Sequence, residues 1–385
     1  MNRNLGFLFA ALVLWGIGEG MFFYFQPLYL QQLGADPLTI GAILGGFGLM
    51  MTVAHIPAGF VADRIGRRPV LRAAWLTGTL AAWIMALSTS INVFIVGLLL
   101  YGLTAFVSAP LTSYVTAARG SLSVGRALTL MSAMFNVGMV FGPVLGGLVG
   151  DRLGLKTIYL IAAGLFVLSS AALFFLRPQP RDHHDPHDPP PGLLNNGRFL
   201  GFVGLSFAVM FALYMAQPLT PNFLQNERGM SLAVIGLIGS VGGLGNAFLL
   251  FTLGNLAPRA GYMIAQALVA LFALIIWQGH AAWMYAGAYF LLGGFRVARV
   301  LGSAQARTLV HPSQMGIAFG ILETINTLPG ILAPPLAGFL YERDPALIYP
   351  LTMVVIALTL ALTALFAPRQ AARHAEISPE EPAHA

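Results

Sequence analysis

The chain has 385 residues, of which 57% are hydrophobic and only 9% are charged. A soluble domain carries roughly 25% charged residues, so this composition excludes a water-soluble globular protein and indicates a protein embedded in a lipid bilayer. The net charge of +6 comes from arginines between apolar segments and predicts no nucleic-acid partner, and the lack of cysteine excludes disulfides and thiolate metal sites.

Twelve apolar segments are long enough to cross a bilayer, which takes about 20 helical residues each. We expect them at residues 5–31, 38–62, 70–89, 91–117, 127–150, 157–176, 199–221, 232–254, 262–279, 282–306, 315–340 and 346–367. If both termini are cytoplasmic, most arginines outside these segments also lie on the cytoplasmic side, as the positive-inside rule requires. The sequence therefore predicts an all-α, multi-pass membrane protein with cytoplasmic termini.

The two halves of the chain repeat one another at a nearly constant offset. Matching pairs are Gln26 with Gln217, Ile40 with Ile235, Gly59 with Gly254, Pro143 with Pro334 and Gly147 with Gly338. The repeat predicts two pseudo-symmetric six-helix bundles, at residues 1–176 and 199–367, with a binding site between them near the membrane midplane. Residues 177–198 are expected to be a cytoplasmic linker, and residues 368–385 a disordered tail.

The turn between the second and third segments reads Gly59-Phe-Val-Ala-Asp63-Arg64-Ile-Gly66-Arg67-Arg68. The pattern Gly-x-x-x-Asp-Arg-x-Gly-Arg-Arg resembles the signature loop of the major facilitator superfamily, whose twelve-helix transporters work by alternating access. The resemblance implies a cytoplasmic gate, which would consist of Gly59, Asp63, Arg64, Gly66, Arg67 and Arg68. The second half departs from the pattern, because Pro258 stands where Asp63 stands in the first half.

The fifth segment contains Gly138-Met-Val-Phe-Gly142-Pro143-Val-Leu-Gly146-Gly147. Glycines at four-residue spacing let another helix approach closely, and the proline interrupts the helical hydrogen bonds. The string resembles a motif of the superfamily's drug:proton antiporters, where it shapes the interface between the halves, so the resemblance implies efflux. That branch also has an arginine in the fourth helix, but residues 94–106 contain none, and proton coupling would need another residue.

Charged residues within the spans are costly and are functional candidates by default. Glu19 lies roughly 21 Å along the first helix, at 1.5 Å per residue, where a poorly hydrated carboxyl could exchange a proton with either side. We expect it to bind the proton or a cationic substrate, and a structural hydrogen bond to a neighbouring helix is the alternative. The residues expected to line the cavity around it are Trp15, Phe22, Gln26, Tyr101, Met210, Tyr214 and Gln217.

The other charges within the spans are Arg296 and Arg299 in the tenth segment and Glu323 in the eleventh. Arg299 and Glu323 should lie at similar depths and could form a buried ion pair. The pair could be a switch that breaks as the halves move, or a fixed structural salt bridge. A third interpretation is an anion site, because guanidinium groups bind carboxylate and phosphate well.

The sequence predicts no cofactor. Residues 182–188 contain histidines and aspartates that could bind a metal, but a solvated linker is the favoured interpretation and no metal site is predicted. No Gly-x-x-x-x-Gly-Lys-Ser/Thr string is present, so an ion gradient would have to supply the energy for transport.

Together these features predict a monomeric secondary transporter of the bacterial inner membrane. The favoured function is export of small hydrophobic or cationic compounds in exchange for protons. One alternative is a transporter of an anionic metabolite or lipid bound by Arg296 and Arg299, and another is a non-transporting membrane receptor. An enzyme is not predicted, because the spans contain no nucleophile–base pair or metal cluster.

Overall fold

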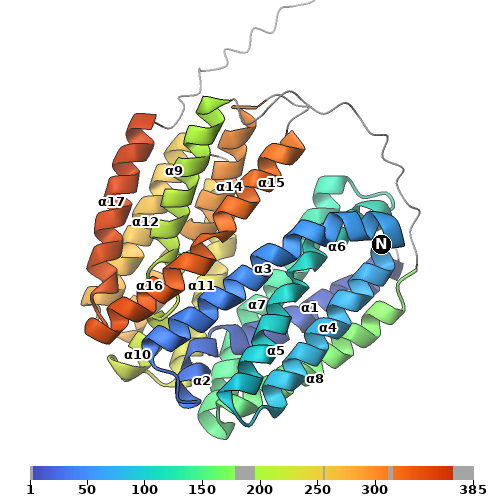
Figure 1. Cartoon of the computed structure of the whole chain (residues 1–385), viewed down its shortest axis with the longest axis horizontal. Helices are drawn as coiled ribbons and strands as arrows, with labels where there is room; N and C mark the ends of the chain where they lie inside the picture. Colours follow the sequence, from blue (N-terminus) through green and yellow to red (C-terminus); the bar gives the residue numbers. More distant parts are fainter. Residues whose placement is uncertain (1–2, 178–195, 255, 311–314, 367–385) are drawn as a thin grey trace, which may run out of the picture.

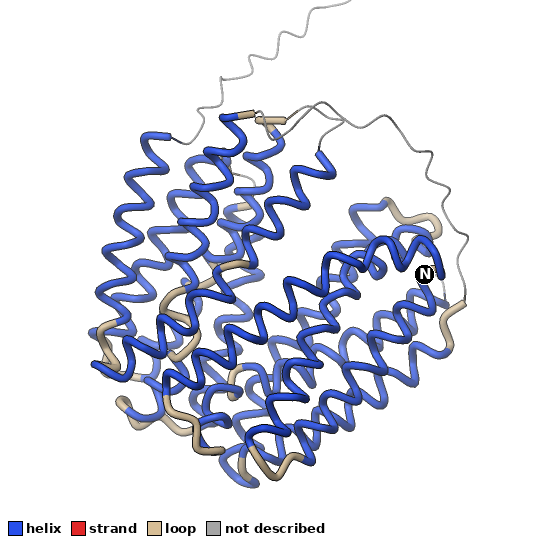
Figure 2. Tube along the Cα trace, in the orientation of Figure 1, coloured by secondary structure: helices blue, strands red, loops and turns tan. Residues whose placement is uncertain are grey.

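The helices of this protein form two bundles that face each other (Figure 1). The computed structural model describes residues 3–177, 196–254, 256–310 and 315–366, without the side chains of residues 3, 55–65, 109 and 315–317. Every regular element in these ranges is helical (Figure 2). The predicted tail and almost all of the predicted linker lie outside the described residues.

The first half contains nine helical elements, one of them a short 3₁₀ helix named η1. They are α1 (Arg3–Phe23), α2 (Gln26–Gln32), α3 (Pro37–Ile65), α4 (Arg67–Leu87), α5 (Ile91–Leu103), η1 (Thr104–Val107), α6 (Ser108–Ala118), α7 (Val124–Leu153) and α8 (Leu155–Phe174). The elements of the second half are α9 (Gly197–Tyr214), α10 (Thr220–Asn226), α11 (Leu232–Leu253), α12 (Pro258–Gln278), α13 (Ala282–Leu291), α14 (Gly294–Arg307), α15 (Met315–Thr327), α16 (Pro329–Arg343) and α17 (Ile348–Phe366).

Nine helices in the described part of the chain are long and apolar enough to cross a membrane. Helix α5 with η1, taken together with α6, passes the same test, although the two pieces are bent by 40°. The spans predicted at 282–306 and 315–340 are each split, into α13 with α14 and into α15 with α16. Each of these predicted spans therefore consists of two consecutive helices, because Gly293 and Pro329 lie where helical hydrogen bonding is interrupted.

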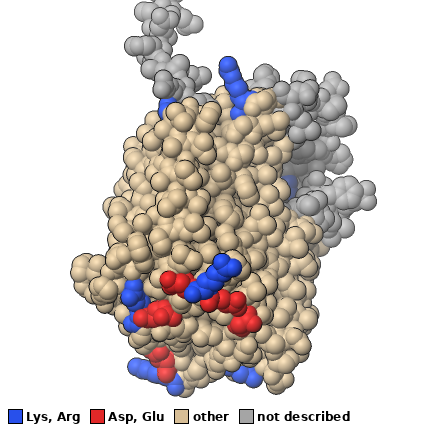
Figure 3. All heavy atoms as spheres, turned by 60° about the vertical axis from the view of Figure 1, so that its left-hand side comes forward, with Lys and Arg blue, Asp and Glu red and all other residues tan. Residues whose placement is uncertain are grey.

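The outer surface is suited to lipid. Figure 3 shows a broad band without charged side chains on one face, with the acidic side chains gathered toward one end and basic side chains at both ends. Large apolar side chains point outward from the helices, and Phe251 and Leu365 are 83% and 75% exposed. Because water would not solvate such a surface, the chain is a multi-pass membrane protein.

The two halves touch at one end and diverge toward the other (Figure 1). We call the end that holds α2 and α10 the closed end, and the end where α8 finishes and α9 starts the linker end. Across the halves, α3 packs on α16 and α7 packs on α11. A Cβ added to Gly41 would lie 2.3 Å from the carbonyl oxygen of Pro334, and one added to Gly236 would lie 2.2 Å from that of Pro143. These equivalent contacts confirm the predicted pseudo-symmetry and show why both positions hold glycine.

Two acidic side chains join the halves at the closed end. Asp151, in the last turn of α7, accepts hydrogen bonds from the backbone amides of Leu232 and Ala233 at 2.8 and 2.9 Å. Those amides belong to the first turn of α11, where the helix dipole favours a negative charge. At the equivalent position, Glu342 accepts one longer bond of 3.3 Å from the amide of Leu38 at the start of α3.

A pair of side-chain amides lies between these two contacts. Gln31 of α2 donates to the Oδ1 atom of Asn226 of α10 at 3.3 Å, and Asn226 donates in return to the Oε1 atom of Gln31 at 3.1 Å. Asn222, also of α10, donates to the same Oε1 atom at 2.6 Å. The halves are therefore joined at the closed end by the side chains of their two short helices, α2 and α10.

Asp151→Asn should weaken the closed end. The amide keeps one acceptor oxygen but loses the charge, and we expect about 1 kcal/mol less stabilisation of the closed contact, or about a fivefold shift toward separated halves. Because the chain has no cysteine, spin labels can be attached specifically to cysteines introduced at Thr89 and His280, which are exposed loop residues of opposite halves at this end. Double electron–electron resonance then measures the separated fraction.

The matched control for Asp151→Asn is Glu342→Gln, which removes the same charge from the equivalent position. Its single hydrogen bond is longer, so the shift in the distance distribution should be smaller. An unchanged distribution in Asp151→Asn would show that the carboxylate does not hold the halves together.

Candidate functional site

Two cavities meet near the centre of the protein. The first has a volume of about 310 Å³ and contains Glu19, and the second has a volume of about 300 Å³ and lies toward the closed end. Four residues line both cavities, namely Phe23, Phe47, Asn136 and Arg296. Because Glu19 belongs to the first half and Arg296 to the second, the central site is built by both halves.

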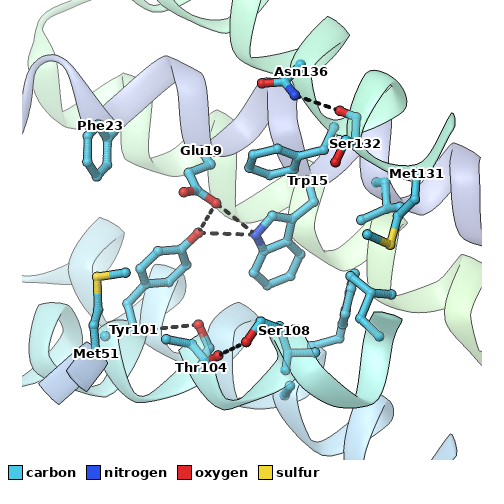
Figure 4. Close-up of a pocket in the computed structure, with 18 of the residues that line it drawn as sticks. Trp15, Glu19, Phe23, Met51, Tyr101, Thr104, Ser108, Met131, Ser132 and Asn136 are labelled. Atoms are coloured by element: carbon cyan, nitrogen blue, oxygen red, sulfur yellow. Dashed lines mark hydrogen bonds between the residues drawn. The ribbon is translucent and has the colours of Figure 1, made fainter. Parts of the chain in front are cut away.

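Glu19 projects from α1 into the first cavity (Figure 4). Its Oε2 atom accepts hydrogen bonds from the hydroxyl of Tyr101 at 2.8 Å and from the indole nitrogen of Trp15 at 3.2 Å. The same indole nitrogen lies 3.2 Å from the hydroxyl oxygen of Tyr101. The Oε1 atom has no hydrogen-bond partner among the residues that the structure describes. One oxygen of the carboxylate is thus held in place, and the other is available to a proton or to a basic group of a ligand.

Stacked aromatic rings fix the position of Trp15. Its ring centroid lies 4.0 Å from that of Phe166, with the planes 7° apart, and 5.3 Å from that of Trp75. A Cβ added to Gly78 would come within 2.5 Å of the indole, so glycine leaves the space that the ring needs. This packing aims the indole N–H at Glu19 before any ligand arrives.

Helix α7 holds the backbone of α1 close beside Glu19. An added Cβ on Gly138, Gly142 or Gly146 would lie only 2.3 to 2.6 Å from backbone atoms of α1. Gly147 instead faces the second half, where its Cβ would lie 2.4 Å from the carbonyl oxygen of Leu232. Three glycines of the motif therefore pack α1 within the first half, whereas Pro143 and Gly147 lie at the interface between the halves.

Most of the predicted cavity residues line the two cavities, and two of them do not. Those that do are Trp15 and Tyr101 in the first cavity and Gln26, Tyr214 and Gln217 in the second. Phe22 and Met210 are each only 1% exposed and belong to the cores of their halves. The prediction assumed that one continuous helix reaches Gln26, whereas α1 ends at Phe23 and α2 begins at Gln26. Phe22 and Phe23 both precede this break, and Phe23 faces the cavity because it lies about 40° from Glu19 around the axis of α1, whereas Phe22 lies about 60° away on the other side.

Several other residues line the cavities and were missed by the sequence analysis. They are Phe23, Ser132, Asn136, Tyr289 and Phe295. Polar side chains within an otherwise apolar helix are the signal that could have identified Ser132 and Asn136. The aromatic residues give no such signal, because the lipid-facing surfaces of a membrane protein are also rich in them.

The two arginines of α14 lie in different cavities. Arg296 lines both central cavities, whereas Arg299 forms an ion pair with Glu323 of α15. The side chains of this pair are 38% and 53% exposed, so the expected ion pair forms but is not buried. Both partners belong to the second half, so movement of one half against the other does not by itself separate them. The two arginines also do not form a joint anion site.

A third cavity, of about 1030 Å³, lies between the halves toward the linker end. The pair of Arg299 and Glu323 lines it together with many hydroxyl groups. These hydroxyl groups belong to Thr52, Ser108, Thr112, Ser113, Thr116, Thr324 and Thr327. Because Ser108 lines both this cavity and the first, the hydroxyl-lined cavity adjoins the one that contains Glu19.

The predicted gate can be described only in part. Gly59, Asp63 and Arg64 fall in the stretch 55–65, whose side chains are outside the described residues. Gly66 alone separates α3 from α4, and its φ of 92° is in the left-handed region that favours glycine. The turn expected between the second and third spans is therefore a single residue, and Arg67 already begins α4.

No group of three or more metal-binding side chains occurs in the part of the chain that the structure describes. The histidines of residues 182–188 lie outside that part, so the structure does not test the alternative of a metal site in the linker.

Comparison with known proteins finds relatives along the whole chain. The profile of the Major Facilitator Superfamily matches residues 8–202 and 202–385. The tetracycline resistance protein, class H, of Pasteurella multocida is 24% identical over 98% of this chain and 100% of its own length. Multidrug resistance protein 2 of Bacillus subtilis is 21% identical over 85% of this chain and 86% of its own. The crystal structure of the nucleoside transporter NupG has the same fold, with a TM-score of 0.79 at 16% identity over 94% of this chain and 98% of that one.

Proposed function

The chain belongs to the Major Facilitator Superfamily of transporters, and we propose that it exports small, largely apolar compounds that carry a basic group, in exchange for protons. Export is supported by the relatives named for tetracycline resistance and for multidrug resistance. These relatives are bacterial, and we place the protein in the inner membrane of a bacterium. The family and the relatives favour transport over the alternative of a receptor.

The proposal rests on the carboxylate of Glu19, of which only one oxygen has hydrogen-bond partners among the described residues. Tyr101 and Trp15 hold one oxygen, and the other faces a cavity lined mainly by apolar and aromatic side chains. A proton and the basic group of a substrate would compete for that oxygen, since each binds the ionised carboxylate. Competition for one site is the simplest way to exchange two solutes across a membrane.

We infer from the arginine distribution that the linker end faces the cytoplasm. The structure would then be the state that is open to the cytoplasm, in which a substrate reaches Glu19 through the hydroxyl-lined cavity. Separation of the halves at the closed end, and their contact at the linker end, would expose the same site to the other side of the membrane. Arg299 and Glu323 line the cytoplasmic cavity in this scheme and influence how readily that side closes.

The test uses purified protein in liposomes that contain a pH-sensitive dye. A panel of lipophilic amines and organic cations is added, and proton movement is recorded for each compound. We expect compounds that are transported to move protons in the opposite direction, and a protonophore to abolish accumulation. Transport of the compounds without any proton movement would contradict the proposed exchange, and transport of anions alone would contradict the proposed substrate class.

A further inference from the structure

Arg296 is a charged residue of the central site, and it has no role in the proposed proton exchange. Its guanidinium lines both central cavities and makes no hydrogen bond or ion pair with any residue that the structure describes. By contrast, Arg299 on the next turn of α14 is paired with Glu323. The side chain of Arg296 is exposed to the cavity, so its N–H groups are free to bind an acceptor on a ligand.

Glu19 and Arg296 together set the charge of the central site. They come from opposite halves and are close enough to interact electrostatically, although they form no direct ion pair. When Glu19 is ionised, the two charges cancel, and when it holds a proton, the site carries one positive charge. Both charges line the first cavity, so a ligand bound there meets both of them, and the charge of the ligand affects how well it binds.

These charges distinguish three kinds of ligand. A ligand with only an acidic group would neutralise Arg296 and leave Glu19 in need of its proton, so that ligand and proton would bind together and could not exchange. A ligand with only a basic group would compete with the proton at Glu19 but would be repelled by Arg296. A ligand with both groups would satisfy both side chains and still displace the proton.

We propose that the central site recognises amphoteric compounds, in which a basic group contacts Glu19 and an acidic group binds Arg296. This proposal rests on the proposed exchange of substrate for protons and adds an acidic group to the substrate. The apolar body of the ligand lies against aromatic side chains such as Trp15 in the first cavity and Phe295 in the second. Guanidinium binds carboxylates through two parallel hydrogen bonds, which gives the acidic group a defined position.

A matched pair of dyes tests the proposal by binding alone. Rhodamine B carries a delocalised cation and a carboxylate, and its ethyl ester carries the same cation without the carboxylate. Fluorescence polarisation at neutral pH gives the dissociation constant of each dye for the purified protein. Charge-assisted hydrogen bonds are worth about 1.5–3 kcal/mol, or about tenfold to a hundredfold in affinity. We therefore expect the acid to bind at least about tenfold more tightly than the ester.

Arg296→Gln should remove this preference, because the acid should bind more weakly and the ester more tightly. Arg296→Lys keeps the positive charge and should retain most of the preference for the acid. The comparison separates the effect of losing the charge from the effect of misfolding. Arg307→Gln is the matched control, because it removes one arginine from the exposed end of the same helix, and it should leave the ratio of the two affinities unchanged. Equal or tighter binding of the ester to the wild type, or an unchanged ratio in Arg296→Gln, would overturn the proposal.

A transport measurement gives a second, independent result. Exchange of one proton for a net-neutral amphoteric compound moves one positive charge inward per cycle, whereas exchange for a cation moves none. A potassium gradient with valinomycin that makes the proton-receiving side negative should therefore accelerate export of the acid and leave export of the ester unchanged. Acceleration of the ester without acceleration of the acid would count against the proposal. Proton-coupled export with equal binding of both dyes would contradict only this inference. A preference for the acid without proton movement would contradict only the proposed exchange.

Discussion

Glu19→Gln is expected to abolish substrate-driven proton movement while leaving the protein folded. Glutamine has nearly the same shape, and its amide oxygen can still accept the hydrogen bonds from Tyr101 and Trp15 that now reach the carboxylate. It cannot take up a proton at neutral pH, and it offers a basic group no negative charge. We expect export against a concentration gradient to fall by about a hundredfold or more, as the loss of a charged contact of about 3 kcal/mol implies.

The measurement is the dye-loaded liposome experiment, with thermal denaturation of each purified variant as a check of folding. Glu323→Gln is the control, since it removes a carboxylate that lines the linker-end cavity and not the central site. Its effect should be about fivefold or less if, as with most exposed ion pairs, its pairing with Arg299 is worth only about 0–1 kcal/mol. Proton movement that persists in Glu19→Gln, or that is lost equally in Glu323→Gln, would place the coupling elsewhere.

The sequence predicts the two-bundle architecture well, because the length of an apolar segment and the bilayer thickness together fix each crossing. It predicts less well where helices break. The segments at 282–306 and 315–340 are apolar throughout most of their length, and only Gly293 and Pro329 mark the points where the structure divides them. A glycine or a proline is compatible with either a kink or a break, and the packing of neighbouring helices decides between them.

Residue-level errors in the site follow from helix geometry. One residue rotates a helix by about 100°, so the neighbouring residues Phe22 and Phe23 of α1 point in different directions, Phe22 into the core and Phe23 into the cavity. Three residues advance a helix by roughly 4.5 Å, which places Arg296 in the central site and Arg299 in the cavity toward the linker end. The sequence pattern groups these two arginines because they share a helix face. It does not indicate that their different depths along the helix place them in different cavities.

Contacts between the halves could not be predicted at all. Asp151 and the amides of α11 are about 80 positions apart in the sequence (81 and 82), and nothing local indicates that they meet. The repeat does, however, identify the positions to examine. Gly41 and Gly236 are equivalent residues. The structure explains why both are glycine, because each lies against a carbonyl oxygen of the opposite half.

The double variant Gly41→Ala with Gly236→Ala should prevent the closed end from closing. Each added Cβ would lie 2.2 or 2.3 Å from a backbone carbonyl oxygen, a distance that no side-chain rotation can relieve. Overpacking of this kind costs about 1–3 kcal/mol per site, and the two sites lie on different helix pairs, so their effects should add. The equilibrium should shift by about 30-fold or more toward halves that are separated at this end.

Spin labels at Thr89 and His280 would report this shift as a longer distance between the loops of the two halves. Transport should fall with it, because alternating access requires the closed state in every cycle, whereas binding of substrate from the separated side should persist. Gly164→Ala is the matched control, since a Cβ there meets no atom within 4 Å and should change neither distance nor transport. If the double variant keeps the short distance and full transport, the glycines are not what allows the halves to close. The hydrogen bonds of Asp151 and of the pair Gln31 and Asn226 would then have to account for closure.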